Sequence, residues 1–306
     1  MKKLSEKVKR RIVVNVTGYL LILPLLIGLV VFTLYPLLVS LFNSFFYNYD
    51  GFGEYKEFDF GLGNYMRAFS GYESKIFWKS IGITFSYAAI MVPLGLALSF
   101  IVALFLNQNV KGIGAFRLIY YIPCLIPAVV QSMVYLYIFN PNYGLMNDIF
   151  VGVGLNKSLF FDSPDYNAVV TFMFMNLFGV GGSMLIWLAG LKSIPTTYYE
   201  AAKLEGGGYF YSLVRITVPL CSPYIFYLLI TNVISTLQIC GNAYMISSTG
   251  GVDNNLLFFG LYIYKTFMNN NFGYSSALAY LLFVVIAVLS AMLFRFNKYV
   301  YYEGDD

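Results

Sequence analysis

Histidine is absent from this chain of 306 residues, and only 11% of its residues are charged. Histidine is the commonest metal ligand and general base, and the long apolar stretches contain no carboxylate that could replace it. A metal site is therefore not expected, and no residue is predicted to be catalytic. Nor is there a G-x-x-x-x-G-K-[ST] loop, so the sequence offers no cradle for the phosphates of ATP.

Cysteine is also scarce. The three cysteines, Cys124, Cys221 and Cys240, all lie in or at the ends of apolar stretches. An odd number of cysteines at such positions argues against a disulfide framework, because buried thiols behave as small apolar side chains. No covalent cross-link is expected to constrain the fold.

Long hydrophobic runs dominate the chain, in keeping with a hydrophobic fraction of 59%. Six runs contain no Asp, Glu, Lys or Arg, and each is long enough to cross a bilayer as a helix. They are Val16–Phe42, Ser80–Leu106, Leu118–Phe139, Tyr166–Leu191, Leu220–Ile246 and Phe272–Phe294. Because open sheets and loops cannot satisfy their backbone groups in lipid, the sequence predicts an all-α polytopic membrane protein with six transmembrane helices.

The first run follows a basic segment and could be mistaken for a signal peptide. It is longer than the apolar core of such a peptide and lacks a small-residue cleavage pattern, so we interpret it as a retained span. The predicted organisation is an N-terminal tail over residues 1–15, a six-span membrane domain over residues 16–296 and a C-terminal tail over residues 297–306.

Basic residues set the predicted orientation. With the N-terminus inside, 13 of the 19 Lys and Arg residues lie in the cytoplasm, and the other six lie outside beside nine acidic residues. Segments rich in Lys and Arg stay in the cytoplasm, so both termini are expected there. The net charge of +4 is thus a sign of topology and not of nucleic-acid binding.

Two local patterns within this layout predict particular structures. In the last outer segment, the apolar and aromatic spacing of Leu256–Phe267 is typical of a helix lying at the membrane surface. Within the fourth run, the glycine-rich residues 179–182 predict close packing of helices. Prolines inside the runs, such as Pro93 and Pro127, are expected to kink their helices.

The most polar interruption of the second half lies at residues 192–219. Pro195 suits the first turn of a helix, because its missing N–H needs no partner there. Residues Thr196–Leu204 contain no helix breaker, and glycines 206–208 allow a sharp turn with positive φ. A second short helix is predicted over Tyr209–Thr217, ending before Pro219. The segment is therefore expected to form a helix-turn-helix elbow.

This elbow resembles the E-A-A-x-x-x-G-(nine residues)-I-x-L-P loop of ABC importer permeases, with Val218 in place of the usual leucine. The matching residues are Glu200, Ala201, Ala202, Gly206, Ile216 and Pro219. The resemblance is to sugar-type permeases related to the maltose transporter's membrane subunits, and it extends from about residue 17 to 296. Further matching stretches include Gly63-Asn64-Tyr65, Leu118-Ile119-Tyr120-Tyr121-Ile122-Pro123 and Phe139-Asn140-Pro141-Asn142-Tyr143-Gly144.

The resemblance implies a type I ABC importer permease fold, with the elbow as a cytoplasmic coupling helix that docks onto the ATP-hydrolysing subunit. The six matching residues would then couple this chain to the ATPase. It implies further that the chain is not an enzyme and holds no cofactor, since ATP and magnesium bind to the ATPase. The implied partners are a second homologous permease subunit, an ATPase dimer, an extracellular solute-binding protein and the lipid of a bacterial cytoplasmic membrane.

Polar and small residues recur at helical spacing in two runs and mark a possible substrate pathway. One stripe comprises Asn232, Ser235, Gln238 and Asn242, and the other comprises Phe172, Asn176, Gly179 and Ser183. Amides could bond sugar hydroxyls and aromatic rings could stack on sugar rings. The other interpretation is hydrogen bonding between packed helices. The residues alone leave both open, and the resemblance favours the pathway because family members bind sugar from these two spans.

The resulting hypothesis is a membrane-spanning permease subunit of an ATP-driven, binding-protein-dependent importer of a neutral sugar or oligosaccharide. The absence of charge from the runs argues against ion-coupled transport and against a strongly ionic cargo. One alternative is the same architecture carrying a polyamine, an amino acid or a glycerophosphodiester. Another is a channel or scaffold protein of the membrane, which would leave the elbow unexplained.

Overall fold

The computed structural model describes residues 6–108 and 110–296. Its regular structure in these ranges is helical, apart from one isolated β-bridge between Phe46 and Phe60, so the predicted all-α class is confirmed. The predicted C-terminal tail, 297–306, and the first five residues of the predicted N-terminal tail lie outside the described residues. Helix α1 begins at Glu6, inside that N-terminal tail.

Most α-helices follow one another closely, and longer connections precede α3, α8 and α15. In chain order they are α1 (Glu6–Leu29), α2 (Tyr35–Ser44), α3 (Gly63–Phe69), α4 (Tyr72–Leu106), α5 (Ile113–Leu125), α6 (Ala128–Ile138), α7 (Leu145–Gly152), α8 (Asn167–Leu177), α9 (Gly181–Ser193), α10 (Thr196–Leu204), α11 (Tyr209–Ser212), α12 (Val218–Leu220), α13 (Ser222–Leu237), α14 (Gly241–Ile246), α15 (Phe259–Met268) and α16 (Phe272–Phe296). Short 3-10 helices are η2 (Tyr55–Glu57), η3 (Phe160–Asp162) and η5 (Val252–Asn254), and π-helical turns are η1 (Val30–Leu34) and η4 (Leu213–Thr217).

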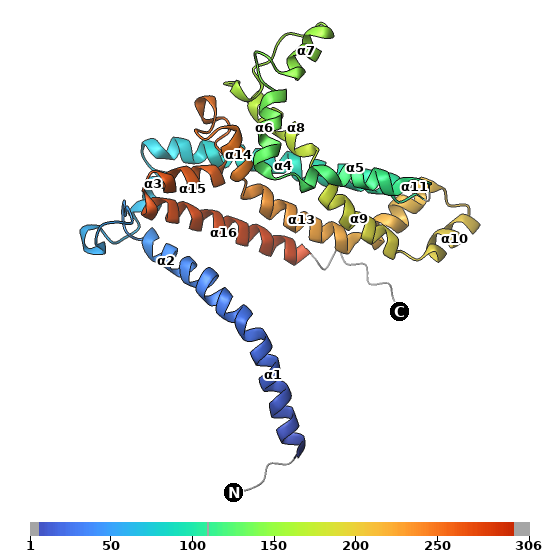
Figure 1. Ribbon diagram of the computed structural model, residues 1–306, viewed down its shortest axis with the longest axis horizontal. Coiled ribbons are helices and arrows are strands. Elements are labelled where there is room, and N and C mark those ends of the chain that lie inside the picture. The colour runs from blue at the N-terminus through green and yellow to red at the C-terminus, as the bar shows by residue number, and fades with distance from the viewer. Residues whose placement is uncertain (1–5, 109, 297–306) are drawn as a thin grey trace.

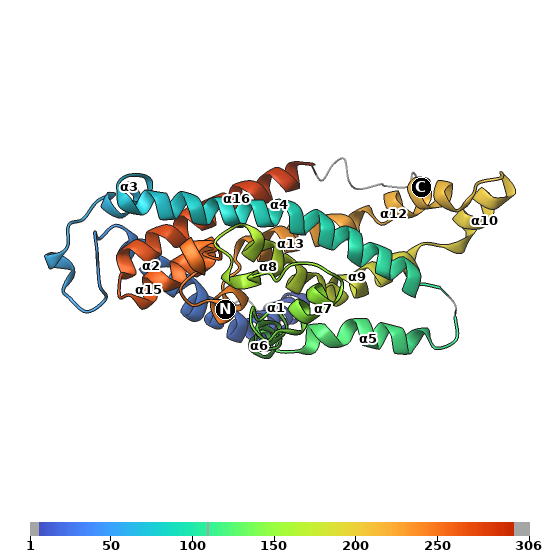
Figure 2. The same ribbon diagram turned by 90° about the horizontal axis from the view of Figure 1, so that it is seen from above.

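Helices α4, α9, α13 and α16 form an elongated bundle (Figures 1 and 2). The α10–α12 segment lies at one end of the bundle, and α3 lies at the other (Figure 1). Helix α1 diverges from the bundle, and the apolar window of Thr17–Ser44 is 0% buried within the chain. The apolar surface of this helix is therefore available to lipid or to another subunit.

Four helical stretches are each long and apolar enough to cross a membrane: Thr17–Ser44, Tyr72–Leu106, Ser222–Ile246 and Phe272–Arg295. Two helix pairs pass this test only together, and both are bent: α5 meets α6 at 95°, and α8 meets α9 at 48°. The described chain therefore has four such helices, or six spans if each bent pair is one span. The six predicted spans are obtained only if each bent pair is counted as one span.

Proline explains one bend. Ile126, between α5 and α6, has the extended conformation (φ −75°, ψ 126°), because Pro127 disfavours helical backbone in the residue before it. Helix α4 instead continues through Pro93. The bend between α8 and α9 was not predicted. There, a Cβ on Gly181 would lie 2.2 Å from the carbonyl oxygen of Tyr120, so the predicted close packing of the glycine-rich stretch is confirmed at this residue.

Two hydrophobic clusters hold the bundle together, and α4 contributes to both. In the first, the Phe258 ring packs 4.9 Å from Phe172 and 5.1 Å from Tyr87, centroid to centroid. In the second, Trp187 lies 4.7 Å from Phe100 and donates its indole N–H to Ser99 Oγ at 3.0 Å. A buried tryptophan with a hydrogen-bond partner avoids the cost of an unpaired donor.

The helix predicted over Leu256–Phe267 is present as α15, but the start of this segment is buried in the bundle and not on a surface. Residues Leu256–Phe259 are at most 3% exposed, and α15 starts within the first hydrophobic cluster. Its first amide, Phe259 N–H, donates to Thr84 Oγ1 at 2.8 Å. The apolar start of this segment is removed from solvent by packing, and α15 lies against α16 and α4.

A buried asparagine side chain fixes the segment around α7, which follows α6 (Figure 1). Asn147, which is 1% exposed, donates to the carbonyl oxygens of Pro141 and Ser158 and accepts from Ser158 N–H, each at 2.9 Å. Both sides of the amide are thus used, and α7 is tied to the chain on each side of it.

Asn147→Leu should destabilise the protein by about 2 kcal/mol, because it leaves two carbonyls and one amide of the half-buried Pro141 and Ser158 without their partner. Thermal unfolding in detergent would show a lower melting temperature. Asn142→Leu, at an exposed position of the same segment, is the control. Equal melting temperatures for the two variants would contradict the structural role of Asn147.

Candidate functional site

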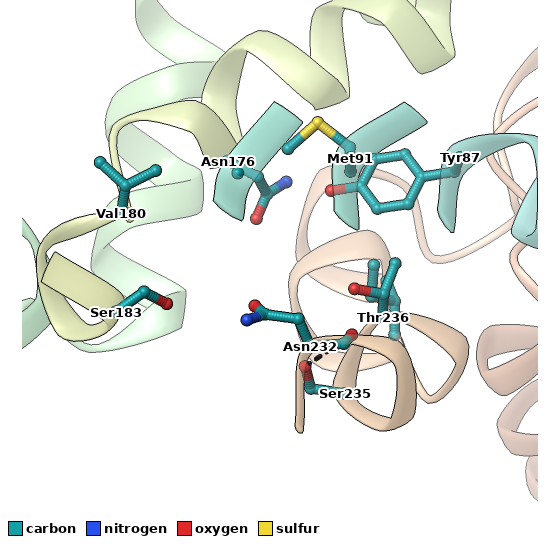
Figure 3. A pocket seen from close by; sticks show the side chains of 11 residues that line it. Tyr87, Met91, Asn176, Val180, Ser183, Asn232, Ser235 and Thr236 are labelled. Carbon is teal, nitrogen blue, oxygen red and sulfur yellow. Dashed lines mark hydrogen bonds between the residues drawn. The ribbon is translucent and has the colours of Figure 1, made fainter. Parts of the chain in front are cut away.

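A cavity of about 260 Å³ lies where α4, the α8–α9 junction and α13 meet (Figure 3). Its lining residues are Tyr87, Met91, Gly95, Asn176, Gly179, Val180, Ser183, Asn232, Ser235, Thr236 and Ile239. None of the described residues in this lining is charged. Along α4 the cavity lies between the first and second hydrophobic clusters, so it is an opening at the centre of the bundle.

Two asparagine side chains dominate the polar surface of the cavity. Asn176 Nδ2 donates to the carbonyl oxygen of Phe172 at 2.8 Å, and Asn232 Nδ2 donates to that of Leu228 at 2.7 Å. Each bond lies within its own helix and uses one amide hydrogen. The second hydrogen and both lone pairs of Oδ1 are left for a ligand or for water. Both amides point into the same space in Figure 3.

The structure brings together five of the eight residues predicted for a pathway: Asn176, Gly179, Ser183, Asn232 and Ser235. The other three do not line the cavity. Phe172 is 0% exposed and lies in the first hydrophobic cluster, packed against Tyr87. Gln238 is exposed elsewhere, and Asn242 lies beyond the end of α13.

The predicted stripe through Gln238 and Asn242 is wrong because the helix is broken there. Helix α13 ends at Leu237, and Cys240 has a non-helical conformation (φ −141°, ψ −61°) before α14 begins. A Cβ on Gly260 would lie 2.6 Å from the carbonyl oxygen of Ile239, so the break sits directly against α15. After residue 237, helical spacing therefore no longer predicts which residues share a helix face.

Three residues of α4 that were not predicted also line the cavity. Tyr87, Met91 and Gly95 recur every four residues in a run that contains no Asn or Gln. The spacing of four residues predicts that these side chains share one helix face. The sequence does not indicate that this face lines a cavity. Tyr87 also packs against Phe172 in a tilted contact and against Phe258 edge to face, so an aromatic layer lies behind this wall of the cavity.

The predicted elbow forms at the far end of the bundle. Its first helix, α10, spans Thr196–Leu204, as predicted. Gly206 follows with φ +81°; its N–H donates to Lys203 O at 3.1 Å, and Gly207 N–H donates to Ala202 O at 2.7 Å. This pair of bonds is a Schellman motif, which requires a left-handed residue at Gly206. The turn is therefore locked by backbone bonds.

The second arm of the elbow differs from the prediction. A helical stretch runs from Tyr209 to Leu220 as α11, η4 and α12, so it continues through Pro219 instead of ending before it. A π-helical turn immediately precedes α12, and the wider turn relieves the clash of a proline ring with the preceding carbonyls. The same arrangement occurs earlier in the chain, where the π-helical turn η1 directly precedes α2 and its Pro36.

Contacts within the elbow separate the matching residues into two sets. Ala202 is 8% exposed and packs inside the elbow, where a Cβ on Gly207 would lie 2.8 Å from its carbonyl oxygen. Glu200 and Ala201 are exposed, and Ile216 and Pro219 are half-buried. Tyr199 Oη and Thr217 Oγ1 are hydrogen-bonded at 3.0 Å across the two arms. Ala202 therefore shapes the elbow itself, whereas Glu200 and Ala201 face outward.

Large apolar side chains remain exposed on the elbow. Leu204 is 90% exposed and Phe210 is 78% exposed, and Tyr209 and Val214 are also mostly exposed. An exposed apolar patch of this kind, next to outward-facing polar residues, is typical of a protein-binding surface.

Comparison with known proteins identifies this architecture. The family model described as "Binding-protein-dependent transport system inner membrane component" matches residues 91–301. The probable ABC transporter permease protein YesP of Bacillus subtilis (strain 168) is 34% identical over 296 residues, which cover 95% of this chain and 94% of YesP. The lactose transport system permease protein LacF of Rhizobium radiobacter is 30% identical over 286 residues, covering 92% of this chain and 93% of LacF.

The fold matches a solved structure as well. A chain in the crystal structure of a bacterial ABC transporter involved in importing the acidic polysaccharide alginate superposes with a TM-score of 0.82 at 19% identity, over 96% of this chain and 99% of that chain. The bent helix pairs and the elbow therefore belong to an ABC importer permease fold. Together these matches show that the chain belongs to the family of binding-protein-dependent transport system inner membrane components.

Proposed function

We propose that this chain is the permease subunit of an ATP-driven importer whose cargo is a neutral sugar or oligosaccharide. The observation that carries the proposal is the central cavity, which offers two asparagine amides, hydroxyl groups and a tyrosine but no charge. Amide and hydroxyl groups complement the hydroxyls of a sugar, and an aromatic side chain suits its ring face. The lactose cargo of LacF, a relative at 30% identity, supports the same class of substrate.

The family excludes a channel or scaffold protein as the alternative, and it assigns ATP hydrolysis to separate subunits. Among importers, a polyamine is disfavoured because no carboxylate lines the described cavity. An amino acid would also need counter-charges for its termini. A glycerophosphodiester is disfavoured as well, because its phosphate is anionic and no Lys or Arg lines the described cavity.

The proposed machine contains a second homologous permease, an ATPase dimer that binds ATP and magnesium, and an extracellular solute-binding protein. We place both termini, residues 1–15 and 297–306, and the 192–219 elbow in the cytoplasm, because this orientation puts 13 of 19 basic residues inside. The second permease would cover the apolar surface of α1, which this chain leaves 0% buried in its central window. The membrane is a bacterial cytoplasmic membrane.

Coupling would run through the elbow. The exposed Glu200 and Ala201, with the apolar side chains around Leu204, form the surface proposed to dock onto the ATPase. Gly206, Ala202, Ile216 and Pro219 would hold that surface in shape. The helical second arm leads into α13, which carries Asn232 of the cavity, so motion of the docked ATPase could reach the substrate.

The decisive experiment is reconstitution of the chain with its co-encoded permease, ATPase and binding protein in lipid vesicles. ATP hydrolysis would be measured with a panel of oligosaccharides, monosaccharides, polyamines, amino acids and glycerophosphodiesters. Stimulation by a sugar is expected. Stimulation by a charged compound and by no sugar would overturn the proposed cargo and leave the family assignment in place.

Asn232→Leu should raise the KM for sugar uptake about tenfold, since one lost hydrogen bond of about 1.4 kcal/mol corresponds to that factor. Uptake of radiolabelled sugar into vesicles measures it. Gln238→Leu is the matched control, because it makes the same change on the same span outside the cavity. If Gln238→Leu impaired uptake and Asn232→Leu did not, the assignment of the cavity would be wrong.

Gly206→Ala should weaken coupling, because an alanine at φ +81° costs about 1 kcal/mol, roughly a fivefold change in an equilibrium. Sugar-stimulated ATP hydrolysis and retention of the ATPase during purification would both fall. Gly208→Ala is the control: Gly208 has φ −79°, and a Cβ there meets nothing within 4 Å. Normal hydrolysis in Gly206→Ala would contradict the proposed role of the turn.

A further inference from the structure

A second polar cavity lies at the end of the bundle opposite the elbow. It has a volume of about 270 Å³ and is walled by α3, α4, α15 and α16. The residues used below are Arg67, Glu73, Tyr262, Lys265 and Tyr274. We refer to this cavity as the outer pocket. It shares no lining residue with the central cavity, and it is charged where the central cavity is neutral.

The cationic side of the outer pocket is held in place by several contacts. Arg67 forms an ion pair with Glu73 through Nη2, and its guanidinium carbon lies 4.3 Å from the centroid of the Tyr274 ring. The hydroxyls of Tyr274 and Tyr262 are hydrogen-bonded at 3.2 Å. The side chains of Arg67 and Glu73 are only 22% and 30% exposed, so their charges are less screened than those of surface residues.

The charges of the outer pocket do not balance. Arg67 and Lys265 provide two positive charges, and Glu73 provides one negative charge. Lys265 Nζ donates one hydrogen bond, to Thr249 O at 2.8 Å, which leaves two of its three hydrogens without a partner in the described chain. By contrast, the segments predicted to lie outside the membrane carry nine acidic and six basic residues. The pocket is therefore a local positive site on a face that is otherwise acidic.

We propose that the outer pocket receives an acidic side chain of the solute-binding protein when that protein docks to deliver cargo. The family is binding-protein-dependent, and the proposed orientation puts this end of the bundle outside, so the inference rests on the proposed function. A carboxylate fits because it would supply the missing negative charge and accept the free Lys265 hydrogens. The cargo itself does not fit, since the proposed cargo is neutral.

The position of the outer pocket gives docking a route to the central cavity. Lys265 and Tyr262 belong to α15, whose first amide bonds to Thr84 of α4. Gly260 of the same helix packs against the carbonyl of Ile239, which lines the central cavity. A partner that shifts α15 therefore acts directly on the broken end of α13.

The test measures affinity of the labelled binding protein for the complete transporter in nanodiscs, at low and at high salt. Lys265→Gln should weaken binding about fivefold at low salt, and the difference should shrink at high salt. Glu73→Gln should act in the opposite direction and tighten binding, because it raises the positive charge of the pocket. Lys75→Gln, which removes an exposed cation of α4 outside the pocket, is the matched control and should change little.

Each other result overturns the proposal. Equal weakening by Lys265→Gln and Lys75→Gln would mean general attraction between the two proteins. Weakening by Glu73→Gln would mean that the ion pair has only a structural role, which thermal unfolding of the variant would show independently. Unchanged binding combined with loss of a dependence on anionic lipid would identify a lipid headgroup as the occupant. Cargo-stimulated hydrolysis by the unaltered transporter tests the proposed function separately.

Discussion

In hydrocarbon, every backbone N–H and C=O must find a partner within the protein, and this constraint decides where the helices of this chain can break. Breaks interrupt three of the apolar runs, at Ile126–Pro127, at residues 178–180 and at residues 238–240. Two of them supply Gly179, Val180 and Ile239 to the wall of the central cavity. Irregular backbone is thus found beside the cavity or packed against neighbouring helices.

The same constraint explains how far the sequence could be interpreted. Hydrophobic runs predicted the helical membrane class, and glycine and proline chemistry predicted α10 and its turn to the residue. Asn176, Ser183, Asn232 and Ser235 could be found because polar residues in an apolar run are conspicuous. Positions that depend on contacts between distant segments could not be found. Helical spacing misplaced Gln238 because α13 breaks just before it. Gly260 of α15 packs against the chain at that break.

Charge is distributed unevenly and according to function. The central cavity has no ionisable lining residue of the Asp, Glu, Lys or Arg type among those described, whereas the outer pocket concentrates three. A neutral lining lets a neutral cargo bind and leave without the large desolvation energies of ions. In the proposed orientation, the charges at the end of the bundle would lie in water, where long-range attraction can orient a partner. Tyr87 belongs both to the first hydrophobic cluster, where it packs against Phe172 and Phe258, and to the cavity lining, so uncharged rings border the cavity on this side.

The two ends of the elbow are joined to the bundle in different ways. On the α9 side, Ile194 and Pro195 have extended backbone (ψ 120° and 137°), which acts as a joint. On the other side, helical structure runs from Tyr209 to Leu220 and resumes in α13 after a single non-helical residue, Cys221. A rotation of the elbow is therefore transmitted stiffly to α13 and only loosely to α9. The wall bearing Asn232 would swing while the wall bearing Ser183 lags, so one rigid-body turn becomes a change in the width of the cavity.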